Sequence, residues 1–76
     1  MNKKYVKVIT EIDEIGKKTP KIIVYDDREF VVDKVIDMKK CASLRVGGVG
    51  ERYKIRINGH ETNLYFEKDK WFVEEK

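Results

Sequence analysis

Alternating polar and apolar residues run on both sides of the pair Asn58-Gly59 in this 76-residue chain. Alternation with a period of two is typical of a β-strand that has one buried face. Asn-Gly is the strongest short signal for the two-residue turn of a β-hairpin, because both residues tolerate positive φ. The pattern therefore predicts a hairpin over residues 51–67.

The two-residue turn fixes the register of this hairpin, and residues paired across it share one face of the sheet. The largely apolar face is expected to meet the core, and it pairs Ile57 with His60, Ile55 with Thr62, Tyr53 with Leu64 and Glu51 with Phe66. The other face pairs Arg56 with Glu61, Lys54 with Asn63 and Arg52 with Tyr65. The basic residues of the hairpin thus gather on the side expected to meet solvent.

One more strand is predicted after this hairpin. A turn at Lys68-Asp69 keeps large apolar groups on the core face, and the expected pairs are Phe66 with Trp71 inside and Tyr65 with Phe72 outside. Trp71 is therefore interpreted as a core residue. The last three residues, 74–76, are expected to fray.

The N-terminal half predicts further strands. Residues 5–12 are rich in β-branched side chains and predict a first strand. Residues 13–20 are expected to form a loop, because Gly16 and Pro20 disfavour a continuous element there. Residues 21–25 and 29–36 are two β-branched runs joined by an Asp-rich turn, which predicts a second hairpin. Apolar side chains on both faces of this hairpin indicate a central place in the sheet.

The segment from residue 31 to residue 44 has two interpretations. Val31, Val35, Met38 and Ala42 fall at helical spacing and allow a short helix. The Val and Ile content and the lack of a good N-cap favour a long bent strand instead. Residues 45–50, which contain three glycines, are interpreted as a flexible connection into the hairpin.

Six strands in hairpin succession predict an all-β fold, a small antiparallel meander curled into an SH3-like barrel or roll. A chain of 76 residues forms one domain, residues 1–76, and supplies no second layer to cover a flat sheet. Hydrophobic residues make up 41% of the chain and charged residues another 41%, which indicates a globular domain with a heavily charged surface.

The net charge of +3 is concentrated in one stretch. Residues 39–58 hold six basic residues and one acidic residue, whereas residues 1–38 are balanced. The candidate contact surface built from this stretch and the facing rings consists of Arg45, Arg52, Lys54, Arg56, Tyr65 and Phe72. Cations that neutralise phosphates beside rings that stack on bases would bind single-stranded nucleic acid. The alternative is a solvated face, with Arg56 paired to Glu61 and Lys70 to Glu67, whose rings are covered by the chain's own loops or N-terminal strand.

No pattern for catalysis occurs in the sequence. The glycine-rich segment 45–52 lacks the spacing of a phosphate loop and is interpreted as a β-connection, although Arg45 and Arg52 could bracket a small anion. Cys41 and His60 are single residues of their kind, interpreted as a semi-buried apolar group and an ordinary turn residue. A barrel this small is expected to enclose no cavity of several hundred Å³. We therefore expect no enzyme, no catalytic residue, no metal and no cofactor.

The central segment reads Val-Gly-Gly-x-Gly-x-Arg-Tyr-x-x-Arg-Ile-x-Gly-x-x-Thr-x-Leu-Tyr-Phe-Glu and is followed by Trp-Phe-Val. Over about residues 25–75 it resembles a group of short uncharacterised bacterial proteins encoded in Gram-positive genomes. The resemblance implies a bacterial cytoplasmic setting and a stand-alone β domain. It implies no activity, cofactor or catalytic residue for this chain.

Two classes of function are expected from these observations. The first is a non-catalytic binding or adaptor module that contacts a protein partner or a second copy of itself, by dimerisation or through an edge strand. The second is a nucleic-acid-binding small β-barrel that uses the basic and aromatic strand face. A lone cysteine, the lack of a secretory segment and the lack of a membrane-spanning apolar run predict a cytoplasmic protein with no membrane contact.

Overall fold

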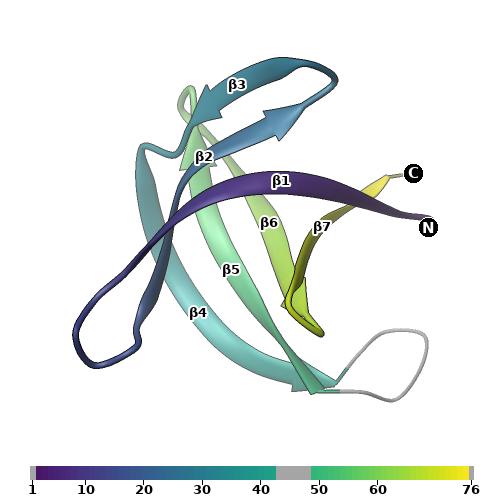
Figure 1. Ribbon diagram of the computed structural model, residues 1–76. Coiled ribbons are helices and arrows are strands. Elements are labelled where there is room, and N and C mark those ends of the chain that lie inside the picture. Colours follow the sequence, from purple (N-terminus) through teal and green to yellow (C-terminus); the bar gives the residue numbers. More distant parts are fainter. Residues whose placement is uncertain (1, 43–48, 76) are drawn as a thin grey trace.

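The structure is a computed structural model that describes residues 2–42 and 49–75, and every regular element in these ranges is a β-strand (Figure 1). The strands are β1 (Asn2–Ile12), β2 (Lys18–Tyr25), β3 (Arg28–Val31), β4 (Lys34–Ala42), β5 (Val49–Ile57), β6 (His60–Glu67) and β7 (Lys70–Glu75). They form one antiparallel sheet in the order β3-β2-β1-β7-β6-β5-β4. The sheet curls into a half-barrel, so that β1 and β2 lie across from β4, β5 and β6. The predicted all-β, curled antiparallel fold is confirmed.

In the described residues, three two-residue turns connect neighbouring strands. Asp26-Asp27, Asn58-Gly59 and Lys68-Asp69 have positive φ at both residues, which is the backbone of a type I′ turn. This turn matches the twist of the strands it joins. All seven predicted pairs between β5 and β6 are confirmed, and so are the pairs of Phe66 with Trp71 and Tyr65 with Phe72.

The first and last strands pair with each other. Tyr5 of β1 lies opposite Phe72 of β7, and Val6 lies opposite Trp71. The ladder continues to Glu75, so the expected fraying is wrong for residues 74 and 75. These residues are ordered because β1, which is far away in the sequence, supplies backbone partners.

Strands β3 and β4 are consecutive in the chain but lie at opposite edges of the sheet. Val32 N–H donates to Lys21 O at 2.9 Å, and Asp33 N–H donates to Arg56 O at 2.8 Å. These two residues therefore step from one edge to the other and draw the edges together. The described residues form seven strands where about six were expected, because the run 29–36 is divided between β3 and β4. The prediction of a central place for the second hairpin is wrong, because β3 lies at an edge of the sheet.

Residues 34–42 form a strand, so the alternative of a helix is wrong in this range. A register shift between Val35 and Asp37 leaves Ile36 as the extra residue of a β-bulge. Val35 and Met38 consequently face the same side, opposite Ile55 and Tyr53. This spacing of three explains why the sequence resembles a helix here.

The expected loop 13–20 ends earlier, because β2 already begins at Lys18 and includes the buried Pro20. A proline lacks the N–H that a central strand needs. Strand β3 pairs with β2 only from Ile22 onwards, so Pro20 has a ladder partner on one side, at Thr10. A register shift between Ile9 and Thr10 accompanies it.

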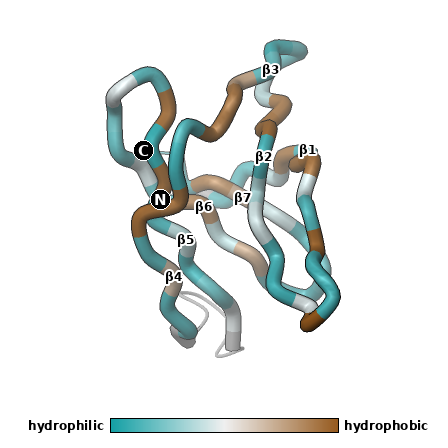
Figure 2. The backbone as a smooth tube through the Cα atoms, turned by 90° about the vertical axis from the view of Figure 1, so that its left-hand side faces the viewer, coloured by the Kyte–Doolittle hydropathy of each residue, from teal (hydrophilic) through white to brown (hydrophobic). Residues whose placement is uncertain are grey.

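The core lies inside the curl of the sheet. Hydrophobic and hydrophilic residues alternate along the strands (Figure 2), and the hydrophobic ones of the core face inwards. The side chains of Ile55 and Leu64 are completely buried. Around them lie the other core residues, Ile23, Val32, Tyr53 and Trp71. The expectation that Trp71 belongs to the core is confirmed.

Candidate functional site

The outer basic strip consists of Arg52, Lys54 and Arg56, at alternate positions of β5 on the face away from the core. On the neighbouring strand β4, Lys39 lies opposite Arg52 and Lys34 lies opposite Arg56. Five cations are thus gathered on two adjacent strands. The sequence predicted the three cations on β5. The two cations on β4 lie beside them because β4 pairs with β5 at this edge of the sheet.

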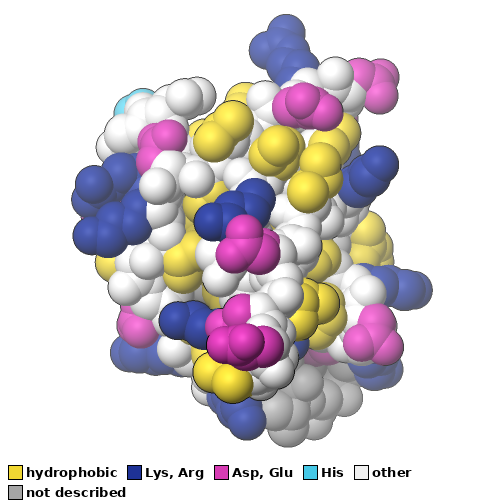
Figure 3. Space-filling model, turned by 60° about the vertical axis from the view of Figure 1, so that its left-hand side comes forward, with side chains coloured by type: hydrophobic (Ala, Val, Ile, Leu, Met, Phe, Trp, Pro, Cys, Tyr) yellow, Lys and Arg dark blue, Asp and Glu magenta, His cyan; other side chains and the backbone are white. Residues whose placement is uncertain are grey.

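Ion pairs reduce the charge of this strip. The carboxylate oxygens of Glu61 lie 3.5 Å from Lys54 Nζ and 3.6 Å from Arg56 Nη2, which confirms the predicted pair of Arg56 with Glu61. Lys54 and Arg56 remain about half exposed, so each pair stabilises the fold by less than about 1 kcal/mol. On the side of the molecule in Figure 3, basic and acidic side chains are likewise interspersed.

The two rings of the candidate contact surface pack against each other. Tyr65 and Phe72 are stacked, with centroids 5.1 Å apart, and Phe72 is only 4% exposed. The edge of Tyr5 lies against Phe72 at 5.8 Å, and Lys3 Nζ lies 4.8 Å from the centroid of the same ring. Phe72 therefore has no free face on which a base could stack. For Phe72 this geometry agrees with the alternative in which the N-terminal strand covers the rings.

Part of the predicted site lies outside the described residues. Arg45 and the glycine segment up to residue 48 belong to this part, as does the side chain of Cys41. Gly50 is described and belongs to β5, not to the expected connection. A Cβ atom at this position would lie 2.9 Å from Phe66 O, so glycine is required here for space.

A hollow of about 400 Å³, which no sequence pattern predicted, lies beside the edge strand β4. Val35 and Met38 of β4 and Tyr53 of β5 line one side of it, and the β1–β2 loop with Ile15 lines the other. Ile15 is 83% exposed and Met38 is 42% exposed. We call this hollow the β4 groove. It joins an apolar surface to β4, which is an edge strand of the sheet formed by the described residues.

A polar network stands at one end of the β4 groove. Tyr53 Oη donates a hydrogen bond to Glu51 Oε1 at 3.2 Å, and Lys18 Nζ lies 3.2 Å from the same oxygen. Burial, with a further contribution from the negative charge of Glu51, raises the pKa of Tyr53 to about 12. Tyr53 is therefore a neutral hydrogen-bond donor at physiological pH and does not supply a nucleophile.

A second hollow, of about 410 Å³, opens at the other end of the core, next to the β5–β6 turn. This hollow is open to solvent, so it does not contradict the expectation that so small a barrel encloses no cavity of several hundred Å³. His60, expected to be an ordinary turn residue, begins β6 and lines this hollow. No lining residue is shared with the β4 groove.

In residues 2–42 and 49–75 no three side chains of His, Cys, Asp or Glu are grouped as a metal site would require. The same ranges contain no helix that could cross a membrane. No protein-family model matches the chain, and comparisons with curated proteins and with solved structures give no significant match. The fold defines the class: a small all-β domain built on one curled antiparallel sheet.

Proposed function

We propose that this domain is a non-catalytic binding module that takes up an extended segment of a partner protein along β4. The observation that carries the proposal is the position of a nine-residue edge strand directly beside the apolar β4 groove. An edge strand offers backbone donors and acceptors to an added strand, and pockets beside it select side chains. The lone Cys41 and the sequence resemblance support a bacterial cytoplasmic setting.

The chemistry of β4 favours a partner that alternates acidic and apolar residues. Val35 and Met38 face the groove, whereas Lys34 and Lys39 face outwards beside the outer basic strip. Side chains of an added strand also alternate between the two faces. Apolar side chains of the partner would pack on Met38, and acidic ones would lie next to Lys34 and Lys39.

The same strand carries features that oppose pairing with a second copy of this chain. Two β4 strands placed side by side would bring their lysines together, and a β-bulge lies at Ile36. The N–H of Met38 also donates to Asp37 Oδ1 at 2.9 Å, so one backbone donor is satisfied in the free protein. The lysines therefore favour an acidic partner over self-association, whereas the bulge and the satisfied N–H limit any added strand to the rest of β4.

The test is a titration of the isotope-labelled protein with a peptide that alternates glutamate and valine, followed by amide NMR shifts. We expect shifts and slowed hydrogen exchange concentrated on β4 and on the β1–β2 loop. A peptide that alternates lysine and valine should bind about tenfold or more weakly, because its positive charges would be repelled by Lys34 and Lys39.

Two exposed apolar residues give a matched pair of variants. Met38→Glu puts a negative charge in the β4 groove and should weaken binding of the acidic peptide by about tenfold or more. Val31→Glu makes the same change at the other edge strand, β3, where Val31 is 62% exposed, and should leave binding within about twofold. Equal effects of the two variants, or shifts outside β4 and its groove, would disprove strand addition at β4.

The second candidate function is binding of single-stranded nucleic acid, and the five cations on β4 and β5 are the observation in its favour. Binding through phosphates should weaken steeply between about 50 and 200 mM salt, whereas an apolar protein contact responds little. Arg52→Glu combined with Arg56→Glu should abolish binding of a fluorescent oligonucleotide. If no oligonucleotide binds at low salt, this candidate is eliminated while strand addition at β4 is untouched.

A further inference from the structure

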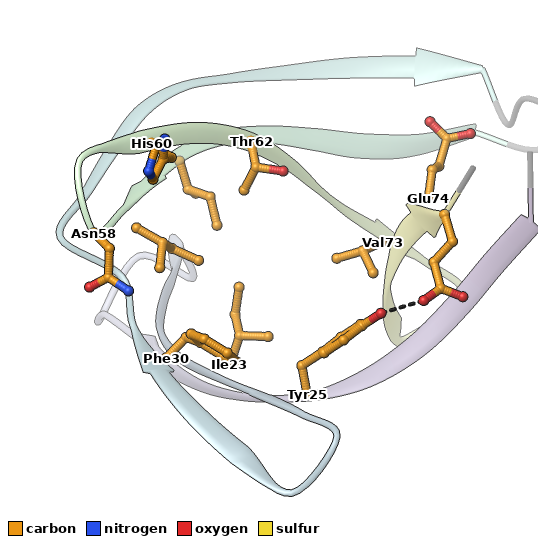
Figure 4. Close-up of a pocket in the computed structure, with 11 residues that line it drawn as sticks. Ile23, Tyr25, Phe30, Asn58, His60, Thr62, Val73 and Glu74 are labelled. Atoms are coloured by element: carbon orange, nitrogen blue, oxygen red, sulfur yellow. Dashed lines mark hydrogen bonds between the residues drawn. The ribbon is translucent and has the colours of Figure 1, made fainter.

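The hollow beside the β5–β6 turn, which we call the mouth, is largely apolar. Figure 4 shows its residues arranged around an open centre, with β2 and β3 on one side and β5 and β6 on the other. Ile23 and Ile55 are 4% and 0% exposed and belong to the core. Phe30, Ile57 and Val73 complete the apolar lining. Buried core side chains therefore form the floor of the mouth, which is open to solvent.

Polar groups stand at the rim of the mouth. Tyr25 Oη donates a hydrogen bond to Glu75 Oε2, and within residues 2–42 and 49–75 no other group forms a hydrogen bond to that carboxylate. This bond to Glu75 raises the pKa of Tyr25, which keeps the phenol protonated as a donor. Thr62 and His60 lie on the opposite side of the opening (Figure 4).

The charge around the mouth is negative. Glu74 and Glu75 line it, and no lysine or arginine does so in the part of the chain that the structure describes. Lys4 lies 4.5 Å from the centroid of Tyr25, but its ammonium is paired with Asp26 Oδ1 at 2.7 Å. Glu75 is the carboxylate that faces the opening, whereas the Glu74 carboxylate points away from it (Figure 4), and in the described residues no lysine or arginine lines the mouth. A cationic ligand would therefore be attracted more strongly than an anionic one.

We propose that the mouth is a binding site for a small apolar amine, with its ammonium group on Glu75 and its hydrocarbon body on Phe30, Ile57 and Val73. A volume of about 410 Å³ lies within the usual range of ligand pockets, which are mostly apolar with a few polar groups. A hydrogen bond between an ammonium group and a carboxylate is stronger than one between neutral groups. The site is separate from the β4 groove, so it goes beyond the proposed function.

Three naphthalene probes that differ only in one group test this proposal. They are 2-naphthylmethylamine, 2-naphthylmethanol and 2-naphthoate, titrated separately into the isotope-labelled full chain. We expect the amine to shift the amides of the mouth and to bind about tenfold or more tightly than the carboxylate, with the alcohol between them. Binding of the carboxylate as tight as that of the amine, or no binding up to the solubility limit, would overturn the proposal.

Three variants locate the site. Glu75→Gln should bring the affinity for the amine down to that for the alcohol and leave the alcohol unchanged. Thr62→Trp fills the mouth from an exposed position and should abolish binding of every probe. Asn63→Trp adds the same ring to the other face of β6 and should bind the probes like the wild type.

Circular dichroism melting of each variant distinguishes loss of the site from loss of the fold. Amine binding that survives Thr62→Trp, or that Glu75→Gln leaves unchanged, would contradict the proposed site. Met38→Glu, the variant that tests the β4 groove, should not alter amine binding. The two proposals therefore fail independently of each other.

Discussion

The β5–β6 hairpin packs differently at its two ends, although the same face of the same two strands points inward at both. Far from the turn, Tyr53 and Leu64 are 3% and 0% exposed, and the rings of Tyr53 and Trp71 lie 5.2 Å apart. Near the turn, His60 and Thr62 occupy equivalent inward positions but are exposed at the mouth. The size and polarity of the inward side chains therefore decide where the half-barrel is filled.

The largest expected effect separates these two ends. Leu64→Ala should lower the free energy of unfolding by about 2–5 kcal/mol, because it leaves a cavity among packed rings. Thr62→Ala changes the same face of the same strand and should cost no more than about 0.5 kcal/mol, because the mouth is already open. Urea unfolding at neutral pH measures both values. Similar losses for the two variants would mean that the ends do not differ in packing.

Local signals predicted most of the packed end. The Asn58-Gly59 turn fixed the register of β5 and β6, and the turn at Lys68-Asp69 placed Trp71 opposite Phe66. These inferences succeed because a two-residue turn determines which residues pair without any information from the rest of the chain.

Contacts between distant segments could not be predicted in this way. The pairing of β1 with β7 brings Tyr5 onto Phe72, and no short-range pattern links these two residues. The step at Val32 and Asp33 depends in the same way on Lys21 and Arg56, which belong to other strands. Both hollows follow from the curl that these contacts produce, so they lay beyond the sequence analysis.

The next prediction concerns the pH dependence of the packed end. The pKa of Tyr53 is raised from 10.0 to about 12 in the folded protein, so the folded state holds this proton longer than the unfolded state. The resulting stabilisation is complete below pH 10 and is lost as the pH rises through 12. A shift of about two pK units corresponds to roughly 2–3 kcal/mol. Urea unfolding between these pH values should show a loss of this order.

Tyr53→Phe is the control for this titration. The variant lacks the ionising group, so its stability should fall less over the same alkaline range. At neutral pH it should lose only about 1 kcal/mol, for the hydrogen bond to Glu51. Parallel loss of stability in the variant and the wild type would show that Tyr53 is not responsible.

The smallest expected effect tests how closely the strands approach at the packed end. Gly50→Ala should lower the free energy of unfolding by about 1–3 kcal/mol. The new Cβ would lie 2.9 Å from Phe66 O, and this backbone atom cannot move away by a change of rotamer. Gly59 at the open end has free space but a φ of +78°, a conformation that asparagine tolerates. Gly59→Asn should therefore cost less than about 1 kcal/mol, whereas Gly50→Asn should be as harmful as Gly50→Ala. If asparagine is tolerated equally well at both positions, lack of space is not the reason for glycine at position 50. The two ends of the hairpin would then differ only in how their side chains pack.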